Sequence, residues 1–181
     1  MSNLRFVKDD AWQAELLGQF DCVFCGGLLY HIDRVAAFAD LLASLTNQLL
    51  IVNTHFAVES GPQQHRLDPI TEHDGYRGRW YTEFPDETTF ADREQYHLSS
   101  WDNRRSFWLL RDEIPELLLD VGFDSVDEEP GRHRIARDVF AHHETLFAAT
   151  RIGDEDSGLA LGARLVQFGQ KFEAHQSTFS K

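Results

Sequence analysis

The chain has 181 residues, of which 42% are hydrophobic and 26% charged, so it is long enough to bury one hydrophobic core. Its net charge of −13 would repel a phosphate backbone, which argues against a nucleic-acid partner. The sequence contains no apolar run of bilayer length and no signal sequence, so we expect a cytoplasmic protein without a membrane partner.

The first half of the sequence predicts three strands and a short link between the first two. Residues 4–8 (LRFVK) suggest a short strand, and residues 11–17 form a brief helical or irregular link. The continuous apolar run at residues 22–25 is typical of a buried parallel strand, and the run at residues 48–53 (QLLIVN) is typical of a second one.

A helix is predicted between the two apolar strands. Asp33 is a suitable N-cap, and Asn47 closes the helix. The apolar face of this helix follows from the helical spacing of Val35, Phe38, Leu42 and Leu45. A strand, a helix and a strand connected in this way predict a βαβ crossover, with the two strands as parallel neighbours.

Cys22 and Cys25 have the spacing of a redox pair or of half a zinc site. Both fall in the first apolar strand, where residues three apart lie on opposite faces, and the sequence has no second cysteine pair. We therefore interpret them as two buried small hydrophobic residues.

Residues 55–105 form a polar, aromatic and turn-rich insertion in which neither a period of two nor one of 3.6 persists. Long irregular insertions in a compact domain are usually functional, and the aromatic content argues against disorder. We expect a cap over a pocket, with short strands or a small helix of its own.

Regular structure returns at Asp112 with a helix that tolerates Pro115 near its start and ends at Gly122. Strands are expected at residues 123–126 and 145–151, separated by a turn at 128–131 and a polar link. We expect one domain over residues 1–151. Residues 152–181 are a helical tail with an apolar stripe at Leu161, Leu165, Phe168 and Phe172.

Three stretches carry a resemblance to a known family: residues 20–31 (FDCVFCGGLLYH), 106–126 (SFWLLRDEIPELLLDVGFDSV) and 146–151 (LFAATR). Together with the order of elements, they resemble the carboxyl-terminal half of class I S-adenosylmethionine-dependent methyltransferases. The resemblance implies a Rossmann-like α/β sheet, mostly parallel with an antiparallel edge strand. The "GxLYH" turn is similar to that of small-molecule methyltransferases and of the tRNA wobble-uridine carboxymethyltransferase.

The chain departs from the family in one respect. Members begin with a strand that ends in a glycine-rich loop, where the backbone approaches the cofactor, and this sequence contains no such motif. Two βα units, at least about 60 residues, are therefore missing, and the sheet is expected to be incomplete. In the family the missing first strand lies between the third and fourth, so residues 4–8 would lack their central partner.

The resemblance assigns cofactor-binding residues. Asp9 or Asp10 matches the acidic residue that binds near the adenine, Asp10 being preferred, and Gly26 and Tyr30 match positions that contact S-adenosylmethionine. The alternative readings are a turn carboxylate and a core tyrosine. His31 is the candidate catalytic base, with capping or packing as its alternative.

Aromatic and basic residues of the insertion are the candidates for binding the methyl acceptor. They suit walls and orienting groups for a small molecule with an anionic or hydroxylated group, or they form the small core of the insertion itself. The candidates are Tyr76, Arg77, Arg79, Trp80 and Trp108. Arginines at 77, 79, 104, 105 and 111 suggest a local anionic site, or else scattered solvated side chains.

We expect no metal, because no histidine or acidic residues have the spacing of a metal motif. Two functions remain open. The chain is a methyltransferase that acts on a small-molecule oxygen or nitrogen, or it is a truncated module that works by assembling with another chain. Both predict that a homodimer or a completing chain covers the open sheet edge.

Overall fold

The computed structural model describes residues 4–60, 65–129 and 144–151, and shows a mixed four-stranded sheet in the order β1-β2-β7-β6. Its strands are β1 (Phe20–Gly26), β2 (Thr46–His55), β6 (Ser125–Glu129) and β7 (Glu144–Thr150). β1 and β2 are parallel, as predicted, and β7 is antiparallel to both β2 and β6. Three strands therefore run in one direction. The antiparallel strand lies inside the sheet, which corrects the expectation of an antiparallel edge strand.

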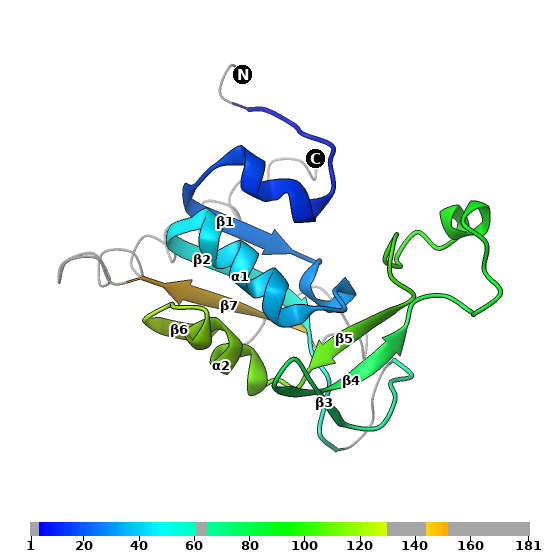
Figure 1. Cartoon of the computed structure of the whole chain (residues 1–181). Helices are drawn as coiled ribbons and strands as arrows, with labels where there is room; N and C mark the ends of the chain where they lie inside the picture. Colours follow the sequence, from blue (N-terminus) through cyan, green and yellow to red (C-terminus); the bar gives the residue numbers. More distant parts are fainter. Residues whose placement is uncertain (1–3, 61–64, 130–143, 152–181) are drawn as a thin grey trace, which may run out of the picture.

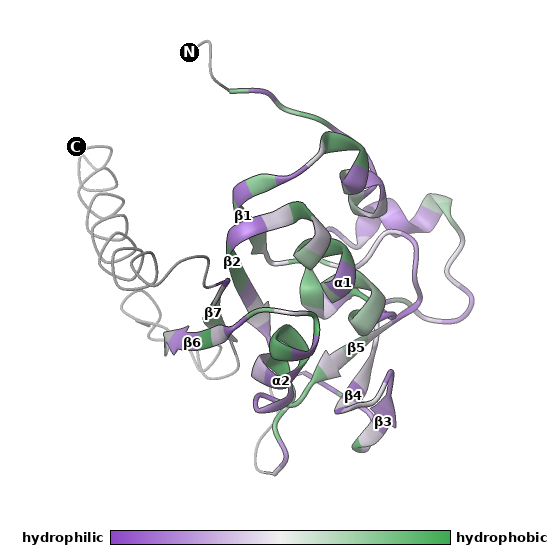
Figure 2. Cartoon of the chain, turned by 60° about the vertical axis from the view of Figure 1, so that its left-hand side comes forward, coloured by the Kyte–Doolittle hydropathy of each residue, from purple (hydrophilic) through white to green (hydrophobic). Residues whose placement is uncertain are grey.

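Two helices cover one face of this sheet (Figure 1). They are α1 (Val35–Leu45) and α2 (Glu113–Asp120), and the 3-10 helix η1 (Ala11–Leu17) packs beside α1. In Figure 2 the two helices and the neighbouring strand segments are mostly hydrophobic. Side chains of β2 that alternate along the strand, including Leu50 and Val52 at 0% exposure, meet the helices, and their burial anchors the core.

The insertion and the residues directly after it form a second, antiparallel sheet in the order β3-β4-β5. Its strands are β3 (Thr71–His73), β4 (Tyr76–Thr82) and β5 (Arg105–Leu109), and the 3-10 helix η3 (Ala91–Gln95) lies in the β4–β5 connection. Figure 1 shows this sheet beside the carboxyl ends of β1 and β2. Short strands or a small helix were expected in the insertion, and the structure has the strands β3 and β4 and the 3-10 helix η3 there.

Two predictions near the amino terminus are wrong. Residues 4–8 form no strand, and Phe6 is 88% exposed, because no described strand offers these residues hydrogen bonds. Asp33 does not cap α1, which begins at Val35 after Arg34 without a side-chain cap.

The ends of the later elements also differ from the predictions. α1 ends at Leu45, and β2 begins at once with Thr46, whose hydroxyl donates to the Leu42 carbonyl over 2.7 Å. β6 is Ser125–Glu129 rather than 123–126, so it extends into the predicted turn. Gly122 follows α2 with a φ of 94°, as expected for a helix end.

β1 exposes one of its faces. Cys25 is buried, as predicted, but Cys22 is exposed, because it lies with Phe20 and Phe24 on the face turned away from α1. The second edge of β1 pairs with no strand among the described residues. The predicted polar link at 132–144 lies outside the described residues except for its last residue, which begins β7, and the tail at 152–181 lies outside them entirely.

Candidate functional site

The turn after β1 lies at the carboxyl end of the parallel strands. Gly27 has a φ of 68°, a region that favours glycine, and its N–H donates to the Asn53 carbonyl over 3.0 Å. A Cβ at Gly27 would lie 3.7 Å from the Tyr30 hydroxyl oxygen. The chain therefore turns tightly here and brings η2 (Leu29–His31) over the end of the sheet.

Aromatic rings from three segments meet beside this turn. The Tyr30 ring lies 4.5 Å from His55, the last residue of β2, and 5.6 Å from Trp108 in β5. His55 stacks on Trp108 at 5.4 Å with the rings 8° from parallel. Trp108 is 2% exposed, and its indole N–H has no hydrogen-bond partner among the described residues. The structure thus brings Tyr30 and Trp108, two residues singled out from sequence, into one cluster.

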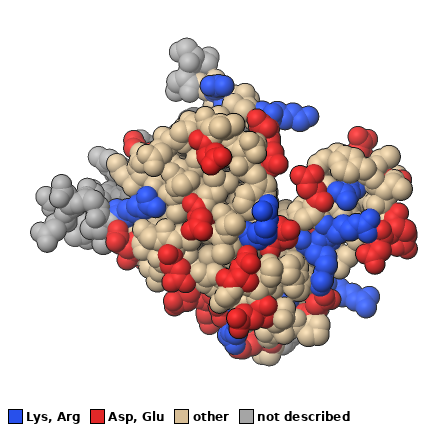
Figure 3. Space-filling view, in the orientation of Figure 1, with Lys and Arg blue, Asp and Glu red and all other residues tan. Residues whose placement is uncertain are grey.

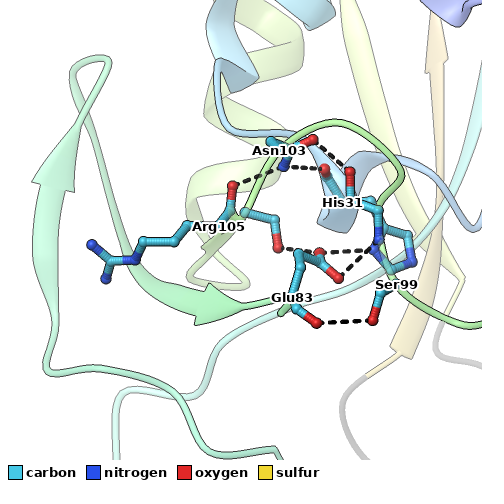
Figure 4. A network of polar contacts seen from close by, with 7 residues as sticks. His31, Glu83, Ser99, Asn103 and Arg105 are labelled. Atoms are coloured by element: carbon cyan, nitrogen blue, oxygen red, sulfur yellow. Dashed lines mark hydrogen bonds and ion pairs between the residues drawn. The ribbon is translucent and has the colours of Figure 1, made fainter. Parts of the chain in front are cut away.

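His31 contacts a buried carboxylate (Figure 4). Its Nδ1 lies 2.9 Å from Oε1 of Glu83, whose side chain has 0% exposure, whereas the His31 side chain is 16% exposed. The hydroxyl of Ser106 donates to the same oxygen over 2.6 Å, and the N–H of Ser100 donates to Oε2 over 3.0 Å. Each oxygen of this buried carboxylate therefore has a hydrogen-bond partner.

Further hydrogen bonds fix the segment that carries these partners. The Ser99 hydroxyl donates to the Glu83 carbonyl over 3.0 Å. The Asn103 amide donates to the carbonyls of His31, over 2.9 Å, and of Arg105, over 2.7 Å (Figure 4). The insertion is thus tied to the β1 turn at both the side chain and the backbone of His31.

The predicted acidic pair has a local structural role. Asp10 is the N-cap of η1, and its carboxylate accepts from the Trp12 N–H over 3.0 Å, while Asp9 accepts from the Asp10 N–H over 2.9 Å. η1 packs on α1 through Trp12 and Phe38, whose rings are 5.2 Å apart. The turn-carboxylate reading therefore describes their contacts, and no described interaction joins them to the β1 turn.

Tyr76 is directed away from the aromatic cluster. Its hydroxyl donates to Asp120 at the end of α2 over 2.8 Å. Burial, this hydrogen bond and the negative charge of Asp120 raise the pKa of Tyr76 to about 12. Trp80 packs in a separate set of rings, 5.1 Å from Phe107 and 4.7 Å from His73. These two predicted acceptor residues are therefore not brought to His31.

The predicted arginine cluster is engaged by acidic or carbonyl oxygens. Figure 3 shows basic side chains over the lobe formed by the insertion, with acidic side chains beside them. Ion pairs join Arg77 to Glu59 and Glu113, Arg104 to Asp86, Arg105 to Asp68 and Arg111 to Glu128. Arg79 donates to the Glu59 carbonyl over 3.1 Å. This pairing leaves little basic charge to attract an anion.

A hollow of about 320 Å³ lies near the carboxyl end of β2, between Arg77 and Arg111. The hydrogen bond to Glu113 is the main cause that raises the pKa of Arg77, and the one to Glu128 does the same for Arg111. Both guanidinium groups therefore belong to ion pairs at the rim of the hollow.

Among the described residues, no three His, Cys, Asp or Glu side chains gather as a metal site. Within the same residues no helix is long and apolar enough to cross a membrane. The polar feature of the site is the pair of His31 and Glu83. Sequence reasoning missed Glu83, which is 52 positions from His31 in a polar stretch without a recognisable motif.

No family model and no curated protein matches this sequence. The structure is similar to the crystal structure of the N-terminal domain of EvdMO1 with SAH bound, with a TM-score of 0.54 and 20% identity. The match covers 80% of this chain and 52% of that chain. The described residues have a methyltransferase-like fold.

Two further solved structures resemble the chain. The same EvdMO1 domain in the presence of SAH and D-fucose matches with the same TM-score and identity, over 80% of this chain and 53% of that chain. An O-methyltransferase family protein from Burkholderia thailandensis aligns over 85% of this chain and 37% of that chain, with 14% identity and a TM-score of 0.49. The chain spans about half the length of the two EvdMO1 structures.

Proposed function

We propose that the chain takes part in methyl transfer from S-adenosylmethionine to an oxygen or nitrogen of a small molecule. The observation that carries this proposal is the similarity to a domain solved with SAH bound, which is the demethylated product of that cofactor. The strand-and-turn geometry at Gly26 and Gly27 supports it, because ligands of open α/β sheets bind beyond the carboxyl ends of the strands.

The residues of the β1 turn fit one wall of a cofactor site. Gly27 leaves its backbone uncovered by a side chain, and the Tyr30 hydroxyl lies over it. Gly26 differs, because the Phe24 ring occupies the space where a Cβ would extend, 2.6 Å away. When bound, S-adenosylmethionine supplies an electrophilic methyl group. On this chain, Gly26, Gly27 and Tyr30 would contact it.

The acceptor side is assigned to the residues that the structure brings beside this turn. Tyr30 and Trp108 form an aromatic wall, and His31 offers a ring nitrogen next to it. Holding the acceptor in line with the methyl group and excluding water supply most of the acceleration in such a reaction. Tyr76, Arg77, Arg79 and Trp80 act in this proposal as the framework of the insertion.

Titration calorimetry with S-adenosylhomocysteine tests the proposal. We expect measurable heat with the wild-type chain and an affinity about tenfold lower for Gly27→Ala, equivalent to about 1.4 kcal/mol. Gly75→Ala is the matched control. Gly75 also has a positive φ, of 87°, but lies in the β3–β4 hairpin with no atom within 4 Å of its Cβ position. Absence of heat with the folded wild-type chain at millimolar ligand counts against cofactor binding by this chain alone.

A second proposal, that the chain works by assembling with another chain, is favoured by the two edges of the four-stranded sheet. β6, at one edge, carries Asp127 and Glu128, charged residues of the kind that keep an edge from pairing. β1, at the other, exposes Phe20 at 44% and Phe24 at 64%. The sheet order and the absent glycine-rich loop support a partner that adds strands at β1.

Sedimentation velocity tests the assembly. We expect a wild-type oligomer at micromolar concentration and a monomer for Phe24→Asp, because a charge on the open edge opposes pairing. Phe90→Asp is the control, since Phe90 is 60% exposed but precedes η3 in the insertion. A wild-type monomer would rule out self-assembly, so the completing chain would have to be a different protein. A pull-down with Phe24→Asp as its negative control then tests for such a partner.

A further inference from the structure

We propose that His31 accepts a proton through Nε2 from a hydroxyl-bearing ligand and that buried Glu83 is the residue that positions it. This inference rests on the proposed function in one respect: the deprotonated oxygen is the atom that would be methylated. The contact between His31 and Glu83 does not depend on the proposed function. The carrying observation is that one ring nitrogen is held by Glu83 while the other is turned away from it (Figure 4).

The neighbours of Glu83 fit its ionised form. An ionised carboxylate can accept from all three of them at once, from the Ser100 N–H at Oε2 and from the Ser106 hydroxyl and Nδ1 of His31 at Oε1. The proposal therefore takes Glu83 as a carboxylate, a buried group whose two oxygens both have hydrogen-bond partners.

The carboxylate in turn defines the tautomer of His31. Nδ1 must carry the hydrogen to donate to Oε1 over 2.9 Å, so Nε2 of the neutral ring holds a free lone pair. Nε2 makes no hydrogen bond to any residue that the structure describes. The Tyr30 ring, 4.3 Å from the imidazole, forms a wall beside it. In the proposal, this nitrogen is the acceptor for a ligand hydroxyl, and the His31 side chain is 16% exposed.

The proton transfer is simple to balance. The O–H bond of the ligand breaks, its electron pair stays on oxygen, and the proton forms an N–H bond at Nε2. The resulting imidazolium faces the Glu83 carboxylate, which keeps its charge and takes no proton. A methyl acceptor that must lose a proton needs a base such as His31, whereas a methyl acceptor with a free lone pair does not. The substrate class that fits is a phenol or another hydroxyl compound.

Long-range proton–nitrogen NMR spectra of the 15N-labelled full chain test the assignment, because they identify which imidazole nitrogen carries the hydrogen. We expect the Nδ1–H form for His31, identified by the signals lost in His31→Gln. His73 is an internal reference of the opposite kind, since its Nε2 lies 2.9 Å from the Asp33 carbonyl and must donate. An Nε2–H form of His31 in the wild-type chain overturns the proposal.

Glu83→Gln tests the positioning role. We expect it to lower the Nδ1–H population of His31, because an amide cannot accept from all three donors. Glu113→Gln is the matched control, since it also removes a carboxylate that pairs with a basic side chain, Arg77, away from His31. An unchanged tautomer in folded Glu83→Gln contradicts the role of Glu83.

The ligand class is tested by adding phenol or toluene, two rings of similar size of which one has a hydroxyl. We expect phenol to shift the Nε2 signal of His31 and toluene to leave it in place. No shift with phenol, or equal shifts with both, overturns the hydroxyl assignment. None of these measurements uses S-adenosylmethionine or its product, so a failure of cofactor binding would be seen separately, in the calorimetric titration.

Discussion

The two cysteines of β1 lie three residues apart and have opposite environments. Cys25 is 5% exposed, and desolvation by burial raises its pKa to about 11, although a backbone hydrogen bond with Leu29 lowers it in part. Cys22 is exposed, and partial burial raises its pKa as well. Because the thiolate is the nucleophile, both thiols are slow to react at neutral pH, and Cys25 also lacks access.

Iodoacetamide labelling checks this difference. We expect the native chain to gain one carbamidomethyl group, at Cys22, with a rate that rises as the pH is raised. Cys25 reacts only after denaturation, and Cys22→Ser leaves the native chain unlabelled. Two groups added to the native protein at similar rates would contradict the burial of Cys25. Peptide mass spectrometry locates the label.

Tyr76 makes the stability of the folded chain fall at alkaline pH. Its folded-state pKa of about 12 lies above the ordinary value of 10, so the native state favours the neutral phenol. The stabilisation is complete below pH 10 and is lost as the pH rises toward 12. Tyr76→Phe should lower the unfolding free energy by about 1 kcal/mol at neutral pH through the lost hydrogen bond to Asp120.

Denaturant titrations at several pH values measure this effect. The wild-type midpoint should fall more steeply above pH 10 than that of Tyr76→Phe. Tyr81→Phe serves for comparison, since burial also raises the pKa of Tyr81. If the unfolding midpoints of wild type and Tyr76→Phe fall in parallel as the pH rises, Tyr76 contributes nothing to the loss of stability at alkaline pH.

Two strand glycines differ in what surrounds them. A Cβ at Gly78 in β4 would lie 2.4 Å from the Trp108 carbonyl oxygen in β5, which the sheet holds in place. A Cβ at Gly26 in β1 would lie 2.6 Å from the ring of Phe24, which is exposed and can rotate away. We expect Gly78→Ala to cost about 1–3 kcal/mol and Gly26→Ala under about 0.5 kcal/mol. Thermal unfolding of both variants measures the difference, and equal shifts would contradict it.

The elements that the sequence predicted well are those set by local patterns. The apolar runs of β1 and β2 and the apolar face of α1 need only their own periodicity, and the short crossover makes the strands parallel neighbours. Residues 4–8 have a strand-like pattern but no partner, and a strand is defined by its pairing. Short strands were expected in the insertion, but β4 and β5 could not be located, because their pairing joins segments that are distant in the sequence.

The candidate site was predictable only in part, for the same reason. Gly26 ends β1, and Tyr30 and His31 lie in the turn after it, so a single motif indicates them together. Trp108 reaches them through the fold of the insertion, and Glu83 through one long-range hydrogen bond. Asp10 has a role that a local pattern also predicts, whereas nothing in the structure tests its predicted contact with the cofactor. A short acidic side chain before a helical turn caps it, whatever family position it matches.

On the scale of the molecule, the two sheets meet at the β1 turn. The Phe107 N–H donates to the Ile32 carbonyl over 2.8 Å, and the Ala57 N–H donates to the Leu109 carbonyl over 2.8 Å. These backbone bonds and the contacts of Glu83 and Asn103 attach the insertion to the carboxyl ends of β1 and β2. The insertion therefore lies beside the β1 turn, whereas the outer edge of β1 has no strand beside it among the described residues.

Hydrogen exchange measured at low and high protein concentration tests whether that edge is covered in solution. β2 and β7 have strands on both sides and should exchange slowly at any concentration. β6 and β1 are both edges, but only β1 exposes large aromatic side chains. If the chain self-assembles through β1, protection at Phe20–Gly26 rises with concentration and that at Ser125–Glu129 does not. Phe24→Asp removes the rise and Phe90→Asp keeps it. Equal behaviour of β1 and β6 at all concentrations would exclude β1 as the surface of self-association.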